Sequence, residues 1–293
     1  MFDPSLTILT TVKNGMPYLK NAVESVLNQN YKNYLYIIVD DGSSDETPRY
    51  LSSIKDQKII VCTIEPSGIP TALNHGLNKI QTEYFAILDS DDLCHPERLQ
   101  AQINFLNNNR EYVLVGTSVN YIGNGGFNRN FKVKMPKENE KITDGLRSNK
   151  FVIAHPTVMI RTKAVKEIGG YNYYSSLIPD ADLYIRLIKK GKLSNLDNIY
   201  SSIRLSAKSF TSSNAKNILK AYSDVNTMGG HNEQNMLKKI SLKLNYYSQY
   251  LYKKALIKYL NGKSVLWFLL LVPAALMYPP KTFYFIKQKF AIR

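Results

Sequence analysis

The stretch IIVDDGSSDET, residues 37–47, runs from apolar β-branched residues directly into four carboxylates between Asp40 and Glu46. The apolar run predicts a buried strand, and the acidic residues mark its end. Negative charges this close repel one another unless a cation, a donor-rich ligand or a helix N-terminus compensates them. The stretch therefore predicts both a central strand and a polar site at its end.

A turn followed by a helix cap accounts for part of this stretch. Gly42 suits a tight bend, and Ser44 or Asp45 suits the cap of a helix that begins near Pro48. Such a turn explains the two adjacent aspartates before the glycine poorly. We therefore expect a turn and a functional site side by side.

Strand and helix signals alternate through the first half of the chain. Strands are expected at residues 6–12, 34–39, 58–64, 83–88 and 111–119, and helices from residues 17, 70 and 96. This order predicts an α/β fold, with a mostly parallel sheet and helices on both faces. Ligands bind such sheets beyond the carboxyl ends of the strands, which is where the acidic residues lie.

The second half is less regular at first. Residues 123–150 are polar and rich in Gly and Asn, which predicts a loop or meander. A strand over residues 151–161 follows, and then a short helix that Gly169 and Gly170 end. Residues 180–191 are expected to form a further helix.

A second acidic run, LDSDD at residues 88–92, also follows an apolar strand. Asp89 and Asp91 lie two residues apart, so their oxygens can converge on Mg²⁺ or Mn²⁺. Either cation also binds diphosphate oxygens. A turn with a helix cap would need one aspartate rather than three. With the first acidic run two strands upstream, this pattern predicts a site for a cation and a diphosphate.

Four ordered motifs carry a resemblance to a known family. They are TTVKNGMPYLKNAVESVLNQNYKNYLYIIVDDGSSDET, PSGIPTALNHGLNKIQTEYFAILDSDD, HPTVMIRTKAVKEIGGY and PDADLYIRL. Residues 6–205 resemble the family 2 glycosyltransferases, which are inverting, nucleotide-sugar-dependent enzymes of the GT-A fold. The resemblance implies a GT-A domain over residues 1–214, with a helical region at residues 215–293.

The resemblance also implies roles for the acidic residues. Asp41 resembles the residue that hydrogen-bonds the nucleobase edge, and Asp40 supports its loop. Asp91 is expected to contact a divalent cation and Asp89 the ribose or the cation. Asp92 is expected either to support these residues from behind or to contact a sugar hydroxyl. Further donor-nucleotide contacts are expected at Thr10, Thr11, Val12 and Asn74.

The family's base motif is altered here. Pro179 stands where relatives have Glu, and Asp180 stands at the position of the catalytic base. Asp182 is the alternative base, but on a helix it lies about 200° from Asp180, so only one of the two can face the site. We choose Asp180, because Asp182 is spaced to pair with Arg186 at i+4. Arg186 is also a candidate contact to the sugar donor or to the acceptor substrate.

A second departure concerns the phosphates. Leu73 stands where many relatives have Arg, which leaves a phosphate contact to Lys13, His75 or His155. His155 begins a segment that in relatives lies near the acceptor or the donor phosphate. A lone histidine is more often structural, so both interpretations of His155 stay open.

The implied reaction is a single displacement. A carboxylate takes the proton of an acceptor hydroxyl as it attacks the anomeric carbon, and the nucleoside diphosphate leaves from the opposite face. The expected donor is a UDP-sugar, and the expected acceptor is a glycan or lipid-linked hydroxyl in bacterial surface polysaccharide synthesis. The alternatives are a nucleotidyltransferase and a non-catalytic sugar-nucleotide or membrane-binding module.

Charge is unevenly distributed along the 293 residues. Residues 1–214 carry 25 Lys and Arg against 21 Asp and Glu, whereas residues 215–293 carry 13 against 2. Within this basic tail, residues 264–278 are strongly apolar but too short to span a bilayer, and Pro273 interrupts them. We expect the tail to bind an anionic membrane surface. Packing in the core or in a homo-oligomer is the alternative, and nucleic-acid binding is not expected.

Two cysteines and an N-terminus without a signal-type apolar stretch predict a cytoplasmic protein. Together with the tail, this places the expected protein at the inner face of the cell membrane, as a peripheral protein.

Overall fold

The computed structural model describes residues 4–123, 130–148, 150–175, 177–205, 251 and 254–259. The chain divides into two compact units, residues 1–120 with 132–203 and residues 121–131 with 204–293. All candidate site residues belong to the first unit.

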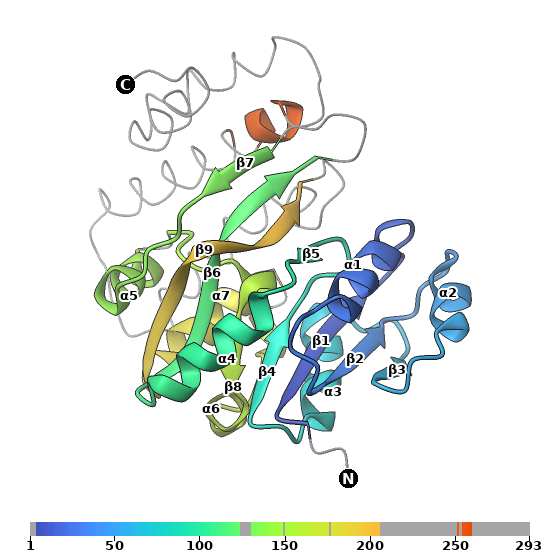
Figure 1. Cartoon of the computed structure of the whole chain (residues 1–293), viewed down its shortest axis with the longest axis horizontal. Helices are drawn as coiled ribbons and strands as arrows, with labels where there is room; N and C mark the ends of the chain where they lie inside the picture. Colours follow the sequence, from blue (N-terminus) through green and yellow to red (C-terminus); the bar gives the residue numbers. More distant parts are fainter. Residues whose placement is uncertain are drawn as a thin grey trace. The chain divides into compact units, whose positions relative to one another are not determined.

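The sheet has the order β3-β2-β1-β4-β8-β6-β9-β5, with β7 paired to β6 outside that path (Figure 1). The parallel strands are β1 (Leu6–Val12), β2 (Tyr34–Asp40), β3 (Ile59–Thr63) and β4 (Tyr84–Ile87). The others are β5 (Leu93–Cys94), β6 (Tyr112–Ile122), β7 (Asn130–Val133), β8 (Met159–Arg161) and β9 (Lys192–Arg204). β8 is antiparallel to both β4 and β6, and β5 is antiparallel to β9. The α/β class is confirmed, and the parallel half of this mixed sheet is the half that ends in the acidic residues.

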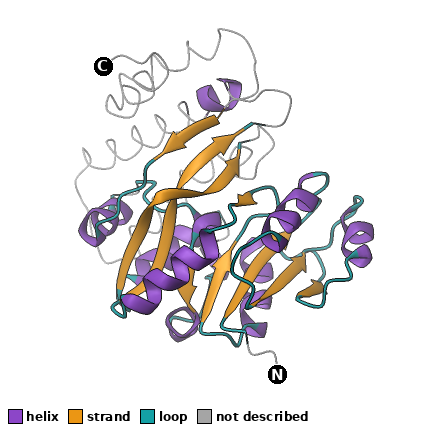
Figure 2. Cartoon of the chain, viewed as in Figure 1, coloured by secondary structure: helices purple, strands orange, loops and turns teal. Residues whose placement is uncertain are grey.

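Helices cover both faces of the sheet, as expected (Figure 2). They are α1 (Tyr18–Leu27), α2 (Thr47–Ser53), α3 (Ile69–Lys79), α4 (Arg98–Asn108), α5 (Asn139–Arg147), α6 (Thr162–Glu167) and α7 (Pro179–Leu187), with 3₁₀ turns η1 (His155–Thr157) and η2 (Tyr173–Ser175). Consecutive residues of β2 enter opposite cores. Ile37 packs in the cluster of Leu77 and Leu183, whereas Ile38 packs in the cluster of Val23 and Leu99. Burial on both faces explains why the strand is continuously apolar rather than alternating.

Two expectations for the second half were wrong in part. Residues 123–150 are not only a loop or meander: they include the strand β7 and the helix α5, whose Ile142 and Leu146 lie four residues apart and are both buried. Of the strand expected over residues 151–161, only Met159–Arg161 (β8) is a strand, because His155–Thr157 just before it form the 3₁₀ turn η1. The glycine pair after α6 is confirmed, with φ of 81° at Gly169 and 72° at Gly170.

The structure describes only part of the basic tail. Residues 254–259 are helical, with Ala255 and Leu256 buried and Lys254 exposed. The apolar segment at residues 264–278 lies outside the described residues. Within the described part of the chain, no helix is both long and apolar enough to cross a bilayer.

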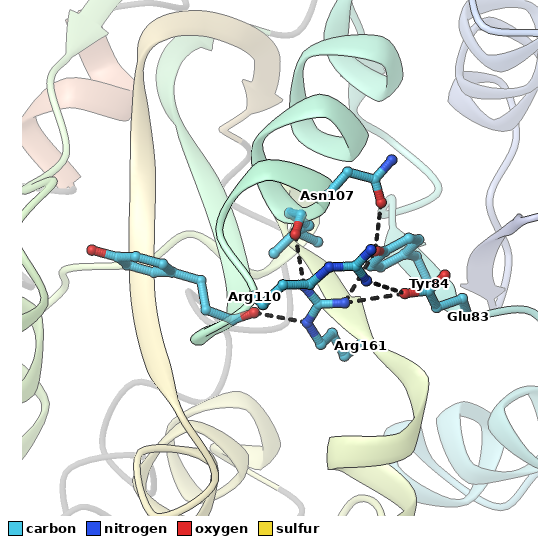
Figure 3. Close-up of polar contacts among 7 residues, drawn as sticks. Glu83, Tyr84, Asn107, Arg110 and Arg161 are labelled. Carbon is cyan, nitrogen blue, oxygen red and sulfur yellow. Dashed lines mark hydrogen bonds and ion pairs between the residues drawn. The ribbon is translucent and has the colours of Figure 1, made fainter.

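Arg161 joins four elements at the edge of the sheet opposite to the acidic residues. Figure 3 shows its contacts with Glu83 and Tyr84. Its guanidinium donates to two main-chain oxygens, one in α4 and one at the start of β6, at 2.6 and 2.9 Å. It also donates to the hydroxyl of Tyr84 at 3.0 Å and to the carboxylate of Glu83 at 3.2 Å. The Tyr84 hydroxyl donates to Asn107 at 2.7 Å, and Arg110 adds an ion pair with Glu83 at 3.6 Å. This network fixes β4 and β8 against α4, which begins next to the candidate site.

Candidate active site at the carboxyl edge of the sheet

Both acidic runs lie at the same edge of the sheet. Asp40 is the last residue of β2, opposite the last residue of β1. The N–H of Leu88 donates to the carbonyl of Leu9 at 3.1 Å, so the chain leaves β4 at this edge and continues into Asp89. The sequence prediction that both runs follow the carboxyl ends of strands is confirmed.

Asp41 is buried and its charge is compensated by the chain itself. Its Oδ1 accepts from the N–H of Ser67 at 2.7 Å and from the Ser67 hydroxyl at 2.9 Å, and its Oδ2 accepts from the N–H of Gly68 at 3.0 Å. Gly68 is the N-cap of α3, so the carboxylate lies at a helix N-terminus. These three bonds leave about one of the carboxylate's four acceptor positions for a ligand.

The two carboxylate oxygens of Asp40 have different surroundings. Its Oδ1 accepts from the N–H of Ser43 at 3.0 Å, which closes the bend at Gly42, where φ is 66°. Its Oδ2 is buried and has no hydrogen-bond partner among the described residues. The expected support of the loop by Asp40 agrees with the first contact. The expected cap of α2 at Ser44 or Asp45 was wrong: Glu46 is the N-cap, and Asp45, one residue earlier, accepts from the N–H of Thr47 at 2.9 Å.

The charges of Asp91 and Asp180 both act on Asp89, although Asp180 lies far along the chain at the start of α7. The pKa of Asp89 is raised to about 7 by loss of solvent, then by the charges of Asp91 and Asp180, with Arg98 opposing. The Asp89 side chain is nevertheless exposed, so we give the two carboxylates more weight than the loss of solvent. Mutually repelling carboxylates form a site that favours positive charge.

Arg98 in α4 is a residue of this site that sequence analysis missed. Its guanidinium is 1% exposed and donates to the carbonyls of Ile87 at 2.8 Å and Val158 at 3.2 Å. Its Nε donates to Gln102 at 3.0 Å, and the Gln102 amide donates to two main-chain oxygens, in β6 and η1, at 2.7 and 2.8 Å. The sequence signal is an i, i+4 pair of polar residues beside the apolar face of a helix. Arg98 thereby fixes the strand ends from which the 88–92 loop departs.

His155 lies between two buried tyrosines. Its Nδ1 is 2.7 Å from the hydroxyl of Tyr184, and its Nε2 is 3.3 Å from the hydroxyl of Tyr171. Burial lowers the pKa of His155, and the charge of Asp180 opposes this shift. Asn74 joins the same group from α3: its amide donates to the Tyr171 carbonyl at 2.7 Å and accepts from the Tyr171 N–H at 2.8 Å.

The remaining candidates divide into internal and accessible side chains. Thr10 is fully buried, and its hydroxyl donates to the Leu88 carbonyl at 2.7 Å, so it ties β1 to β4. Val12 is also buried, whereas Thr11 is partly accessible and Lys13, which follows β1 directly, is exposed. Thr11 and Lys13 are therefore better placed than Thr10 and Val12 to contact a donor nucleotide.

Two further aspartates, Asp182 and Asp92, interact with arginines of the chain. Asp182 accepts from the Nε of Arg186 at 2.9 Å, and the Arg186 guanidinium also donates to the Ile168 carbonyl at 2.8 Å. The expected i, i+4 pair is therefore confirmed. Asp92 is 2% exposed and lies close enough to Arg98 for its charge to act on the guanidinium.

Residues 7–169 match the model of the family described as Glycosyl transferase family 2. The chain belongs to this family. It is 30% identical to an uncharacterised glycosyltransferase of Methanocaldococcus jannaschii, over 67% of this chain and 73% of that protein. It is 29% identical to Bacillus subtilis EpsE, over 64% of this chain and 68% of EpsE. The match spans a smaller share of other relatives' length, such as 60% of an uncharacterised glycosyltransferase of Rickettsia typhi.

Solved structures support the GT-A fold of this family 2 glycosyltransferase. The structure superposes on residues 1–349 of S. aureus TarS in complex with UDP-GlcNAc with a TM-score of 0.60 and 15% sequence identity. The superposition covers 88% of this chain and 84% of the TarS chain. The same TarS fragment in complex with UDP has a TM-score of 0.58 and 15% identity, over 94% and 89%.

A divalent cation fits the donor set of this family 2 site. Within the described residues, no three His, Cys, Asp or Glu side chains form a complete metal centre. Mg²⁺ commonly binds one or two carboxylates and completes its shell with substrate phosphates and water, so a complete protein centre is not required. Asp89 and Asp91 supply hard oxygen ligands whose mutual repulsion a cation would relieve.

Arg98→Lys should destabilise the fold, because lysine retains the charge but lacks the planar fork that reaches Ile87, Val158 and Gln102 together. We expect a loss of about 2–4 kcal/mol in the free energy of unfolding, because the buried hydrogen bonds to the Ile87 and Val158 carbonyls and to Gln102 are lost. Urea unfolding measures this loss. The control is Arg49→Lys, at a position where the side chain is 86% exposed and pairs with Glu46. Equal midpoints for the two variants would contradict the role of Arg98.

Proposed function

We propose that this chain transfers a sugar from a nucleotide-sugar to an acceptor hydroxyl, with inversion at the anomeric carbon. The observation that carries the proposal is the electrostatic coupling of Asp180 with Asp89, which brings a candidate base and the D-x-D run to one site. We further propose a UDP-sugar as the donor, by analogy with the UDP and UDP-GlcNAc complexes of TarS. The proposed acceptor is a glycan or lipid-linked hydroxyl of a bacterial surface polysaccharide.

In this mechanism Asp180 accepts the proton of the acceptor hydroxyl while the oxygen forms its bond to the anomeric carbon. The bond from that carbon to the diphosphate breaks on the opposite face, and the electron pair leaves with the nucleoside diphosphate. One displacement inverts the centre without an enzyme nucleophile. A cation held by Asp91 and Asp89 would supply charge neutralisation to the leaving diphosphate.

Donor recognition is assigned to the edge formed by β1 and β2. Asp41 retains about one acceptor position for a nucleobase N–H, and Thr11 and Lys13 are accessible beside it. Lys13 is our choice for the phosphate contact that Leu73 does not provide, because it is exposed whereas His155 is already bonded on both ring nitrogens.

The first test is donor hydrolysis without added acceptor, with UDP-sugars and with Mn²⁺ present or absent. We expect nucleotide release that depends on Mn²⁺, and near-complete loss of release in Asp91→Asn, because a charged hard ligand is removed. A nucleotidyltransferase would instead form a nucleotide-sugar from a nucleoside triphosphate, and a binding module would release nothing. Full activity in Asp91→Asn or in excess chelator would contradict the metal assignment.

The second test separates the two acids of α7. Asp180→Asn should lower turnover by roughly 10²–10⁴-fold while the KM for the donor stays nearly constant, because the base meets the acceptor. Asp182→Asn is the matched control on the same helix. It should keep turnover within a few-fold and cost about 1 kcal/mol of stability, because its partly exposed pair with Arg186 is lost. The reverse pattern would assign the base to Asp182.

We also propose that the basic tail attaches the protein to the inner membrane face as a peripheral protein. Each Lys or Arg near an anionic surface adds about 1 kcal/mol of attraction. Full-length protein should therefore sediment with vesicles that contain anionic lipid but not with neutral vesicles, and high salt should partly release it. Absence of sedimentation with anionic vesicles would assign the tail to a core or a subunit interface.

A further inference from the structure

The hydroxyls of Tyr171 and Tyr184 occupy both ring nitrogens of His155, and none of this trio has a part in the reaction described so far. We propose that Tyr171 and Tyr184 are positioning residues that hold His155 in one tautomer and, through it, fix the helix turn that carries Asp180. This inference rests on the proposed function, since it assumes that Asp180 is the base.

The proton count of the trio supports a fixed arrangement. A neutral imidazole has one N–H donor and one bare nitrogen acceptor. One tyrosine must therefore donate its proton to His155, and the other must accept from it, which leaves one O–H free to donate elsewhere. Burial lowers the pKa of His155 and raises the pKa of both tyrosines, so the neutral forms are the ones to count.

The free O–H lies in the neighbourhood of Asp180. After burial, the charge of Asp180 is the largest influence on the pKa of both tyrosines, and Asp89 acts on them too. Asp180 and Tyr184 are four residues apart on α7, so they share one face of the helix. The trio thus offers a hydrogen-bond donor on the side of the carboxylate that takes the acceptor's proton.

The trio is held from two further directions. The Asn74 amide binds both main-chain groups of Tyr171, which fixes this residue relative to α3. At Gly170 φ is 72°, and a Cβ would lie 2.6 Å from the Asn74 oxygen, so only glycine fits beside this clamp. The trio therefore links η1 to α7 directly, and to α3 through Tyr171 and Asn74.

These hydrogen bonds favour a structural role for His155 over direct contact with the donor or the acceptor. Because both ring nitrogens are hydrogen-bonded within the chain, the imidazole acts on the reaction through Tyr184 and α7. Loss of the trio should therefore change the turnover number rather than donor affinity.

The test compares Tyr184→Phe with Tyr34→Phe in the full-length enzyme. Tyr34 is a matched control: it is 1% exposed and its hydroxyl donates to the Val26 carbonyl at 2.9 Å, so each substitution removes one buried hydrogen bond. Tyr184→Phe should lower the turnover number for transfer about tenfold, at constant donor KM, whereas Tyr34→Phe should change it less than about twofold. Equal effects of the two substitutions, or a raised donor KM in Tyr184→Phe, would overturn the proposal.

A second readout needs no turnover and therefore separates this inference from the proposed function. Long-range ¹H–¹⁵N NMR spectra, with the His155 signals assigned by His155→Asn, report the tautomer directly. We expect one tautomer in the wild type and in Tyr34→Phe, and a mixture in Tyr184→Phe. A mixture in the wild type would overturn the inference even if the enzyme transfers sugar. A single tautomer without any transfer would leave the positioning intact and contradict the function.

Discussion

The buried guanidinium of Arg98 is the contact on which the arrangement of the site depends. The β4–β8 pair is antiparallel, and at its end the N–H of Ile87 donates to the carbonyl of Val158. Arg98 donates to the carbonyls of both residues, so it closes the pair just before the chain turns into Asp89. A buried charge costs several kcal/mol unless it is paired and fully bonded. Here Gln102 and the nearby carboxylates supply that compensation.

The carboxylates of this edge fall into two groups by the way their charge is compensated. Asp41 and Asp182 are compensated within the chain, by main-chain and side-chain N–H donors. At Asp89, loss of solvent and the charges of Asp91 and Asp180 instead raise the pKa. Asp41 thus fixes its loop and Asp182 pairs along α7, whereas a cation or a proton would relieve the repulsion at Asp89. This division gives a physical reason to assign chemistry to the second group only.

Local patterns predicted those parts of the structure that depend on neighbours in the sequence. The limits of β1, the bend at Gly42 and the pairing of Asp182 with Arg186 all follow from spacing of a few residues. β9 was not predicted, because polar Ser194 and Asn195 interrupt its apolar pattern. These two residues are buried and donate to main-chain oxygens of residues 136 and 137, a compensation that only the folded chain supplies.

The sequence by itself determined that two acidic runs follow the carboxyl ends of two strands, β2 and β4, and that the chain resembles a family 2 glycosyltransferase. It also predicted the pair of Asp182 with Arg186, on which our choice of Asp180 as the base rests, because an ion pair at i+4 needs only helical geometry. The tertiary structure alone decided that Thr10 and Asn74 are internal, that Arg98 lies beneath the acidic loop, and that His155 lies between two tyrosines. The physical reason is that these hydrogen bonds join residues between 11 and 97 positions apart, and such partners are chosen by the packing of whole elements rather than by local spacing.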